Sequence, residues 1–346
     1  MKYIAPSKES DLFSMIDHQQ KMARTTKGIN KLSIYIQWED FREELESILG
    51  YNTRDLNKGG RPPFDPVFMF KVLVLQKYHG LSDEATQDQI ADRFSFMKFL
   101  GVHPGDSIPD RNTIWDFKKS LEINGRKGSK RLFKLFQKML SNRGVISREG
   151  SIVDASFIAA PRQRNSRSEN EEIKQGNRPE DFKVNAAKNR QKDCDARWSK
   201  KKNETHYGYK NHIKVDAKTK LIIECTTTAA NVHDSKVFKD LVNKEDQAIF
   251  ADSAYQSQEN EDYVLGPCDS QEFIILKANR NQPLSEAERL INKRRSRIRV
   301  RVEHVFARMS QFCMDQLQSI GLKRAHYHNN LSNLIYNMDR YAFLCK

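Results

Sequence analysis

The chain of 346 residues contains little cysteine, and none of it is arranged in pairs. Its five cysteines are widely spaced and form no Cys-x-x-Cys motif, which excludes a disulfide framework and a zinc knuckle. No uncharged apolar run approaches the ~20 residues that span a bilayer, and the start, MKYIAPSKES, lacks the apolar segment of a signal peptide. GxGxxG and Walker motifs are also missing, which disfavours nucleotide-driven chemistry. The sequence therefore predicts a protein of a reducing, cytoplasmic compartment.

Positive charge, in contrast, is abundant. The 59 basic residues outnumber the 45 acidic ones and give a formal net charge of +14. Such a surplus implies a polyanionic partner, and nucleic acid is the commonest. The densest cluster has seven cations and no acid: Arg289, Lys293, Arg294, Arg295, Arg297, Arg299 and Arg301. Because like charges one turn apart destabilise a helix, phosphate contact explains this cluster better than a solvated face does.

The first part of the chain reads as helical. After an N-terminal arm over residues 1–60, three short amphipathic helices are expected. They begin at capping residues, namely Asp65, Ser82 and Asp110. A fourth, basic helix follows over 127–142. Short helices joined by tight turns indicate a helical DNA-binding domain over 61–145, of the helix-turn-helix kind. A plain helical bundle that packs on the main domain is the alternative.

From Ile146 the pattern changes to strands. SIVDASFIA reads as a strand, and HYGYKNHIKVD and LIIECTTTA read as a hairpin closed by AKTK. AIFADSAY and EFIILK are further strands, and the chain from Glu286 is helical with a break at Gly321. This order predicts a mixed α/β (α+β) sheet domain over 146–346. A polar, basic insertion at about 162–203 has few large apolar residues and is expected to be mobile.

Three acidic residues stand in unusual contexts. Asp154 interrupts one strand, Asp252 another, and Glu303 lies within the arginine-rich helix. Acids are depleted from strands, so these positions indicate a function. Three carboxylates among cations are what a divalent-metal site for phosphoryl transfer requires. Each acid also has a structural alternative: an exposed strand edge, a helix cap, or an ion pair with Arg299. Asp234 is expected only to cap the helix that begins at Ser235.

Candidate nucleic-acid contacts come from two elements. In the hairpin, Lys210 and His212 share a face, whereas Tyr209 and Ile213 lie on the opposite face and are expected in the core. We therefore predict that Lys210 and His212 face the substrate. The helical cluster adds four arginines to this surface: Arg295, Arg297, Arg299 and Arg301.

These residues match a known pattern. VDAS around Asp154, AIFADSAYQ around Asp252 and RVEHVF around Glu303 closely resemble the DDE transposases of bacterial insertion sequences. The nearest group is the one founded on the insertion sequence numbered five. GRPPFDPVFMFKVLVLQKYHGLSDE and TTTAANVHD fit the same pattern, so the resemblance covers most of residues 40–340. Two positions depart from it: Ser296 replaces a frequent tyrosine, and Ser310 replaces a basic residue for which Arg308 is a nearby substitute.

The resemblance implies a ribonuclease-H-like catalytic domain. Asp154, Asp252 and Glu303 would be the catalytic acids and the ligands of two Mg²⁺ ions, for which Mn²⁺ could substitute. The implied activity is metal-dependent cleavage at transposon ends and strand transfer into target DNA. The implied partners are double-stranded DNA, as terminal inverted repeats and target, and further copies of the chain in a homodimer or larger assembly at the bacterial nucleoid. A nuclease without strand transfer and a catalytically silent, transposase-derived DNA-binding protein are the alternatives.

Overall fold

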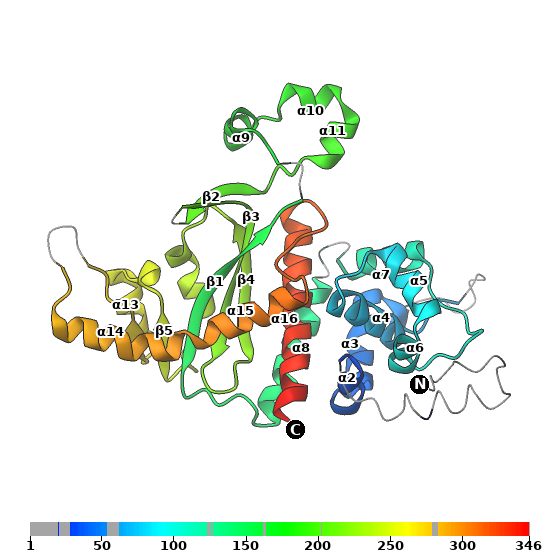
Figure 1. Ribbon diagram of the computed structural model, residues 1–346, viewed down its shortest axis with the longest axis horizontal. Helices are drawn as coiled ribbons and strands as arrows, with labels where there is room; N and C mark the ends of the chain where they lie inside the picture. The colour runs from blue at the N-terminus through cyan, green and yellow to red at the C-terminus, as the bar shows by residue number, and fades with distance from the viewer. Residues whose placement is uncertain are drawn as a thin grey trace, which may run out of the picture.

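The computed structural model describes residue 20 and residues 28–53, 62–122, 125, 127–161, 164–201, 203–278 and 283–345. Much of the expected N-terminal arm, and residues 162, 163 and 202 of the expected insertion, lie outside these ranges. Figure 1 shows a mixed sheet on one side and a group of helices on the other, with the long helix α16 (Leu322–Leu344) between them. None of the described helices combines the length and apolar character needed to cross a membrane.

The sheet is built around β1 (Ser151–Ala159), which pairs antiparallel with β3 (Glu204–Asp216) and parallel with β5 (Ala248–Ala251). The remaining described strands extend it: β4 (Ile222–Ala229) beside β3, β6 (Gln271–Ile274) parallel to β5, and β2 (Arg197–Lys201) beside the start of β3. The order β4, β3, β1, β5, β6, with an antiparallel half and a parallel half, is ribonuclease-H-like. The predicted α/β fold with a mixed sheet is therefore confirmed.

The hairpin of β3 and β4 closes around the buried carboxylate of Asp216. Its Oδ1 accepts hydrogen bonds from the N–H groups of Lys218 (3.0 Å) and Thr219 (2.7 Å) in the turn. Its Oδ2 accepts from the N–H of Ser147 (2.9 Å), just before β1. One acid therefore closes the turn and holds the entry to the central strand, because each bond satisfies a backbone donor that would otherwise be lost.

The helical part consists of seven helices within the described ranges: α2 (Asn30–Tyr35), α3 (Arg42–Leu49), α4 (Pro66–Tyr78), α5 (Asp83–Asp92), α6 (Phe94–Leu100), α7 (Arg111–Glu122) and α8 (Gly128–Asn142). The three predicted caps are confirmed. Asp65, Ser82 and Asp110 accept hydrogen bonds from backbone N–H groups three residues ahead, at 2.9, 3.1 and 2.7 Å. Helix α6 was not predicted, because it is short and its first residue has no side-chain cap.

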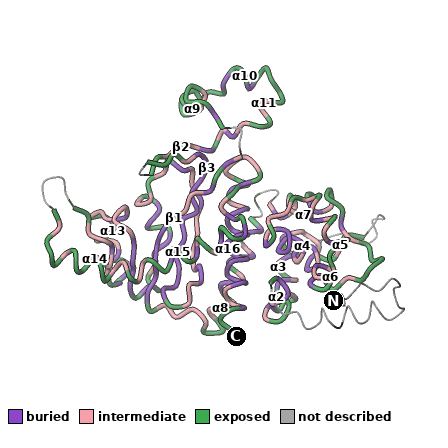
Figure 2. Tube along the Cα trace, in the orientation of Figure 1, coloured by how far each residue is buried: buried purple, intermediate pink, exposed green. Residues whose placement is uncertain are grey.

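The basic insertion contains regular structure that the sequence did not predict, whereas its mobility stays a prediction. It forms α9 (Arg167–Lys174), α10 (Glu180–Val184) and α11 (Ala186–Gln191) above the sheet. Asp193 anchors its end, because Oδ1 and Oδ2 accept from the hydroxyl of Tyr209 on β3 (2.8 Å each) and Oδ2 from the N–H of Gly321 (3.0 Å). Most of this segment is nevertheless exposed (Figure 2), so composition gave little sign of these few anchoring contacts.

The helices that follow the sheet are α12 (Phe238–Leu241), α13 (Gln258–Leu265), α14 (Glu286–Arg299), α15 (Arg301–Gln311) and α16. Helix α16 is buried along much of its length (Figure 2) and packs against β4 on one side and α2, α4 and α8 on the other. One apolar cluster consequently contains Phe70 of α4, Ile213 of β3 and Leu334 of α16. The division into an arm, a helical domain and a catalytic domain stays a prediction.

Candidate active site

Asp154 and Asp252 lie on neighbouring strands. The strands β1 and β5 run parallel, and Val153 lies opposite Ala251. The residues that follow these two are Asp154 and Asp252, so the two acids are neighbours. Asp154 is buried, whereas Asp252 is half-buried directly after β5. The Oδ1 atom of Asp252 also accepts from the N–H of Ser253 (2.7 Å) and caps a short 3₁₀ turn. The side chain of Asp252 therefore both caps this turn and lies next to Asp154.

Burial dominates the electrostatics of Asp154. It raises the pKa of this carboxyl to about 6, and the negative charge of Asp252 contributes in the same direction. The N–H of Ala155, the guanidinium of Arg299 and the ammonium of Lys201 oppose the rise. Two acids that share a poorly solvated site favour either a proton or a cation between them.

Glu303 is connected to Asp154 by hydrogen bonds from one shared guanidinium, that of Arg299. The Nη1 atom of Arg299 donates to Oδ2 of Asp154 (3.0 Å), and its Nη2 donates to Oε1 of Glu303 (2.9 Å). The side chain of Arg299 is 19% exposed and that of Glu303 is 54% exposed. The ion pair between Glu303 and Arg299 that was the structural alternative is therefore present. The same guanidinium nevertheless links Glu303 to Asp154.

The arrangement differs from a formed metal site. Across the residues that the structure describes, no group of three or more His, Cys, Asp or Glu side chains is placed to hold a metal ion. Arg299 instead forms ion pairs with two of the three predicted ligands, Asp154 and Glu303. The assignment of Asp154, Asp252 and Glu303 as catalytic acids and metal ligands stays a prediction.

The predicted contacts from the hairpin lie below the surface. Lys210 is buried, and its Nζ donates to Oδ1 of Asp234 (2.8 Å) and to the carbonyl oxygen of Val232 (2.8 Å). His212 is fully buried against Thr228 (Nε2 to Oγ1, 2.8 Å), and burial lowers its pKa to about 4. DNA contact through Lys210 or His212 would require these interactions to open.

A fourth acid, Asp234, lies close to the candidate active site, which the sequence did not predict. The prediction that it caps the following turn is wrong, because the side chain that accepts from the N–H of Ser235 belongs to His233 (3.4 Å). Asp234 instead forms the ion pair with Lys210. The buried hydroxyl of Tyr255 connects it to the site: its pKa is raised by burial and then by the charges of Asp154, Asp234 and Asp252. The Asp234 carboxylate therefore lies near the candidate catalytic pair.

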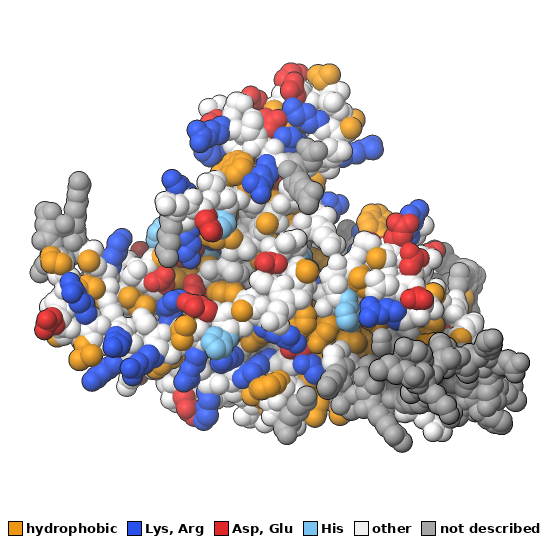
Figure 3. All heavy atoms as spheres, in the orientation of Figure 1, with side chains coloured by type: hydrophobic (Ala, Val, Ile, Leu, Met, Phe, Trp, Pro, Cys, Tyr) orange, Lys and Arg blue, Asp and Glu red, His pale blue; other side chains and the backbone are white. Residues whose placement is uncertain are grey.

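The four arginines predicted to bind DNA have different environments. Arg299 is bonded to acids, and Arg295 is half-buried, with its Nη1 donating to the carbonyl oxygen of Ile274. Arg297 and Arg301 are exposed. Cationic side chains gather along the edge of the molecule formed by α14 and α15 (Figure 3). The exposed members are Arg289, Lys293, Arg294, Arg297 and Arg301.

Arg308, the nearby substitute for the basic residue missing at Ser310, is bonded to an acid. Its Nε and Nη2 atoms donate to the two carboxylate oxygens of Asp339 on α16, at 3.0 and 3.2 Å. This side chain is therefore used to join α15 to α16. Arg308 could take the role of the basic residue missing at Ser310 only if its bonds to Asp339 opened.

Comparison with known proteins agrees with the motifs. The family described as "Transposase DDE domain" matches residues 146–338, and the family described as "Transposase domain (DUF772)" matches residues 17–120. Among solved structures, a piggyBac transposase synaptic complex with hairpin DNA, determined by cryo-electron microscopy, is similar with a TM-score of 0.45 and 11% identity. That alignment covers 94% of this chain and 76% of the other. Since the first family spans more than half of the sequence, the chain belongs to the DDE transposases, enzymes that cut DNA and transfer its strands.

Proposed function

We propose that Asp154, Asp252 and Glu303 are the catalytic acids of an insertion-sequence transposase. The enzyme cuts DNA at transposon ends and joins the resulting 3′-hydroxyls to target DNA. The observation that supports this most is the placement of a buried acid beside a second acid on neighbouring parallel strands, with a third linked to the first by one guanidinium. The motifs around these acids support membership of the group founded on the insertion sequence numbered five.

The donor set fits a hard divalent cation, Mg²⁺ or Mn²⁺, because all three side chains offer carboxylate oxygens. Asp154 and Asp252 concentrate negative charge in a poorly solvated place, where Arg299 already supplies a cation. Bound at Asp154, Asp252 and Glu303, two such ions supply activation of the attacking oxygen and stabilisation of the leaving oxygen. For Glu303 to act as a ligand its bond to Nη2 of Arg299 has to open, and this nitrogen could then donate to a DNA phosphate while Nη1 stays bonded to Asp154.

The protein orients these carboxylates before substrate arrives. The N–H of Ala155 donates to Oδ1 of Asp154 (2.8 Å), and the N–H of Ser253 donates to Oδ1 of Asp252 (2.7 Å). The other oxygen of Asp154, Oδ2, accepts from Nη1 of Arg299 (3.0 Å), so a metal ion at this oxygen would have to displace the guanidinium. Because both acids are fixed by the sheet, little reorganisation is needed when the reacting phosphate binds.

Double-stranded DNA is the proposed substrate, both as terminal inverted repeats and as target. The exposed cations of α14 and Arg301 precede Glu303 along the chain, on the cationic edge formed by α14 and α15, and fit the phosphate backbone. The helical domain proposed over residues 61–145 would add contacts further along the DNA. Since two transposon ends have to be held together, we expect a homodimer or larger assembly on DNA, at the nucleoid in the bacterial cytoplasm.

The test is Mg²⁺-dependent cleavage of DNA that carries the repeats flanking the coding gene. Wild-type protein should cut at the repeat ends, whereas Asp154→Asn should bind the same DNA with unchanged affinity and cut none of it. Asp240→Asn, which changes an exposed acid on α12, is the matched control and should cut normally. Normal cutting by Asp154→Asn would refute the assignment of the acids.

Product analysis separates the alternatives. With a supercoiled target plasmid, a transposase joins the cut ends to the plasmid, whereas a nuclease without strand transfer leaves only nicked or linear products. Binding of the repeats without any cutting, in both Mg²⁺ and Mn²⁺, would identify a silent DNA-binding protein.

A further inference from the structure

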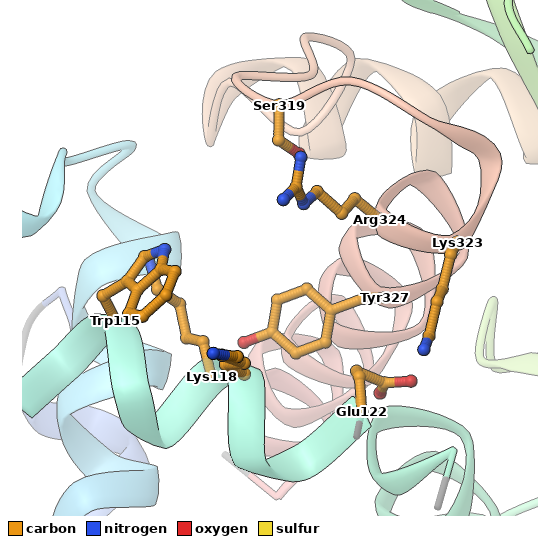
Figure 4. Close-up of a pocket in the computed structure, with 8 residues that line it drawn as sticks. Trp115, Lys118, Glu122, Ser319, Lys323, Arg324 and Tyr327 are labelled. Carbon is orange, nitrogen blue, oxygen red and sulfur yellow. The ribbon is translucent and has the colours of Figure 1, made fainter. Parts of the chain in front are cut away.

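A second site lies on the far side of α16 from the sheet, between α7 and α16. It is a cavity of about 570 Å³. Figure 4 shows Trp115 and Lys118 on α7, and Lys323, Arg324 and Tyr327 on α16, facing one another across it. Nothing in the proposed cleavage chemistry uses these residues.

The cavity exposes an aromatic ring. Trp115 is 50% exposed, and Nζ of Lys119 lies 4.8 Å from the centroid of its ring. The ring of Tyr327 reaches from α16 toward Lys118 (Figure 4). Its hydroxyl is buried and has no hydrogen-bond partner among the residues described, so it keeps an unused donor beside the cavity. An exposed indole beside a cation is suited to stacking on a flat, anionic ligand.

The charge of the cavity is positive. Four cations line it, at Lys118, Lys119, Lys323 and Arg324, against the single acid Glu122. Lys118 is paired with Asp83, and Oε1 of Glu122 already accepts from the N–H of Ser129 (2.9 Å). The positive electrostatic potential in the cavity therefore comes mainly from the exposed side chains of Lys119, Lys323 and Arg324. This potential favours a phosphate ligand.

The cavity continues toward the candidate active site. An adjoining cavity of about 610 Å³ shares Trp115, Arg324 and Tyr327 with it and extends to Pro161, just beyond the end of β1. From Asp154 to Pro161 an extended strand covers roughly 23 Å. A DNA strand of that length contains about six or seven nucleotides at the spacing of a duplex. One DNA strand of this length can therefore reach from Asp154 to the edge of the adjoining cavity at Pro161. The two cavities together are called the groove.

We propose that the groove binds an unpaired nucleotide of the DNA substrate. Its base stacks on Trp115, and its phosphates contact Lys119, Lys323 and Arg324. Pairing has to be absent because the faces of bases inside a duplex are covered by their neighbours, whereas an indole can stack only on a free face. This inference rests on the proposed function, since it assigns a second contact to the DNA that the acids cut.

The experiment compares a short labelled single strand with a blunt duplex of the same sequence, by fluorescence anisotropy on the full chain. Trp115→Ala should weaken single-strand binding by roughly ten- to a hundred-fold, while Trp115→Phe, which keeps a stacking face, should restore most of it. Lys323→Gln and Arg324→Gln should each lower the salt slope for the single strand by about 0.7. Duplex binding should change by less than about two-fold with Trp115→Ala, because every base face inside the duplex is covered and only the outer faces of the two end pairs are free.

The matched control is Phe343→Ala. Phe343 is also an exposed aromatic, at 58%, with a cation beside it (Arg340, 4.9 Å from the ring), but it lies near the end of α16 outside the groove. It should leave single-strand binding unchanged. Equal single-strand affinity of Trp115→Ala and wild type, or an equal loss with Phe343→Ala, would overturn the proposal. Asp154→Asn should bind the single strand normally, so normal cutting by that variant would refute the catalytic assignment while the result for Trp115 stands.

Discussion

At the scale of single residues, the burial of Asp154 reduces the stability of the fold, and Arg299 offsets part of this loss. Asp154 is only 8% exposed, and burial of an ionised carboxyl group costs free energy that an apolar side chain at the same place would not cost. Arg299 and the N–H of Ala155 stabilise its charge but do not cancel the effect of burial on its pKa. An acid that reduces stability yet occupies the centre of a sheet is expected where function requires it.

Replacement of Asp154 by Asn should therefore stabilise the metal-free protein. Since burial raises the folded-state pKa from 3.8 to about 6, the ionised form is disfavoured in the fold, and the wild type loses stability as pH rises through this range. The increase in the free energy of unfolding caused by Asp154→Asn should be absent below about pH 4 and reach at most about 3 kcal/mol above about pH 7. Urea denaturation in EDTA at both pH values measures it. A difference that does not depend on pH would contradict the expectation.

At the scale of elements, a buried ion pair holds three segments of the sheet together. Nζ of Lys214 on β3 donates to Oδ2 of Asp246 (2.9 Å), and Oγ of Ser151 on β1 donates to Oδ1 of the same acid (2.6 Å). Asp246 lies just before β5, and its side chain is 4% exposed. This acid therefore fixes the register of the two strands that carry Asp154 and Asp252.

Loss of the Asp246 carboxylate should destabilise the sheet strongly. Asp246→Ala leaves Lys214 buried without a partner, which typically costs about 3–5 kcal/mol. Glu245→Ala, which removes an exposed neighbouring acid, should cost less than about 1 kcal/mol. Denaturant midpoints of the two variants provide the measurement. The double variant Lys214→Met with Asp246→Leu should recover most of the loss, and a failure of Asp246→Ala to destabilise would show that the pair contributes nothing.

At the scale of the whole molecule, α16 joins the helical part to the sheet. Its Asp339 is bonded to Lys31 of α2 (Nζ to Oδ1, 2.5 Å), to Tyr78 of α4 (hydroxyl to Oδ1, 3.0 Å) and to Arg308 of α15 (Nε to Oδ2, 3.0 Å). Although burial alone would raise the pKa of Asp339, its bonds to Arg308 and Lys31 lower it. Because one core and one acid connect both parts, the chain should unfold as a unit.

Asp339→Ala should accordingly lower stability without separating the two parts. We expect a loss of about 3–5 kcal/mol at neutral pH, since three polar partners lose a shared acceptor, and a smaller loss at acid pH where the wild-type carboxylate is protonated. Tryptophan fluorescence, which includes Trp38 of the helical part, and far-ultraviolet circular dichroism should report the same single transition. Two separated transitions in the wild type would show that the parts unfold independently.

Local chemistry in the sequence determined the elements and the identity of the acids. The caps at Asp65, Ser82 and Asp110, the strand alternation around Asp154 and the family motifs act within a few residues, so they can be read without the fold. The shared core was not visible, because it depends on which apolar faces meet. The helices of the insertion were missed for the same reason, since they are anchored by contacts with distant segments.

Only the tertiary structure decided which charges meet. Arg299 faces Asp154 across 145 positions of the chain, and Lys210 turns inward to Asp234 instead of toward solvent. Sequence patterns report the face of an element on which a side chain lies, but not what the fold brings against that face. The energy of an ion pair depends on that neighbour and on burial, and both are set when distant segments pack together.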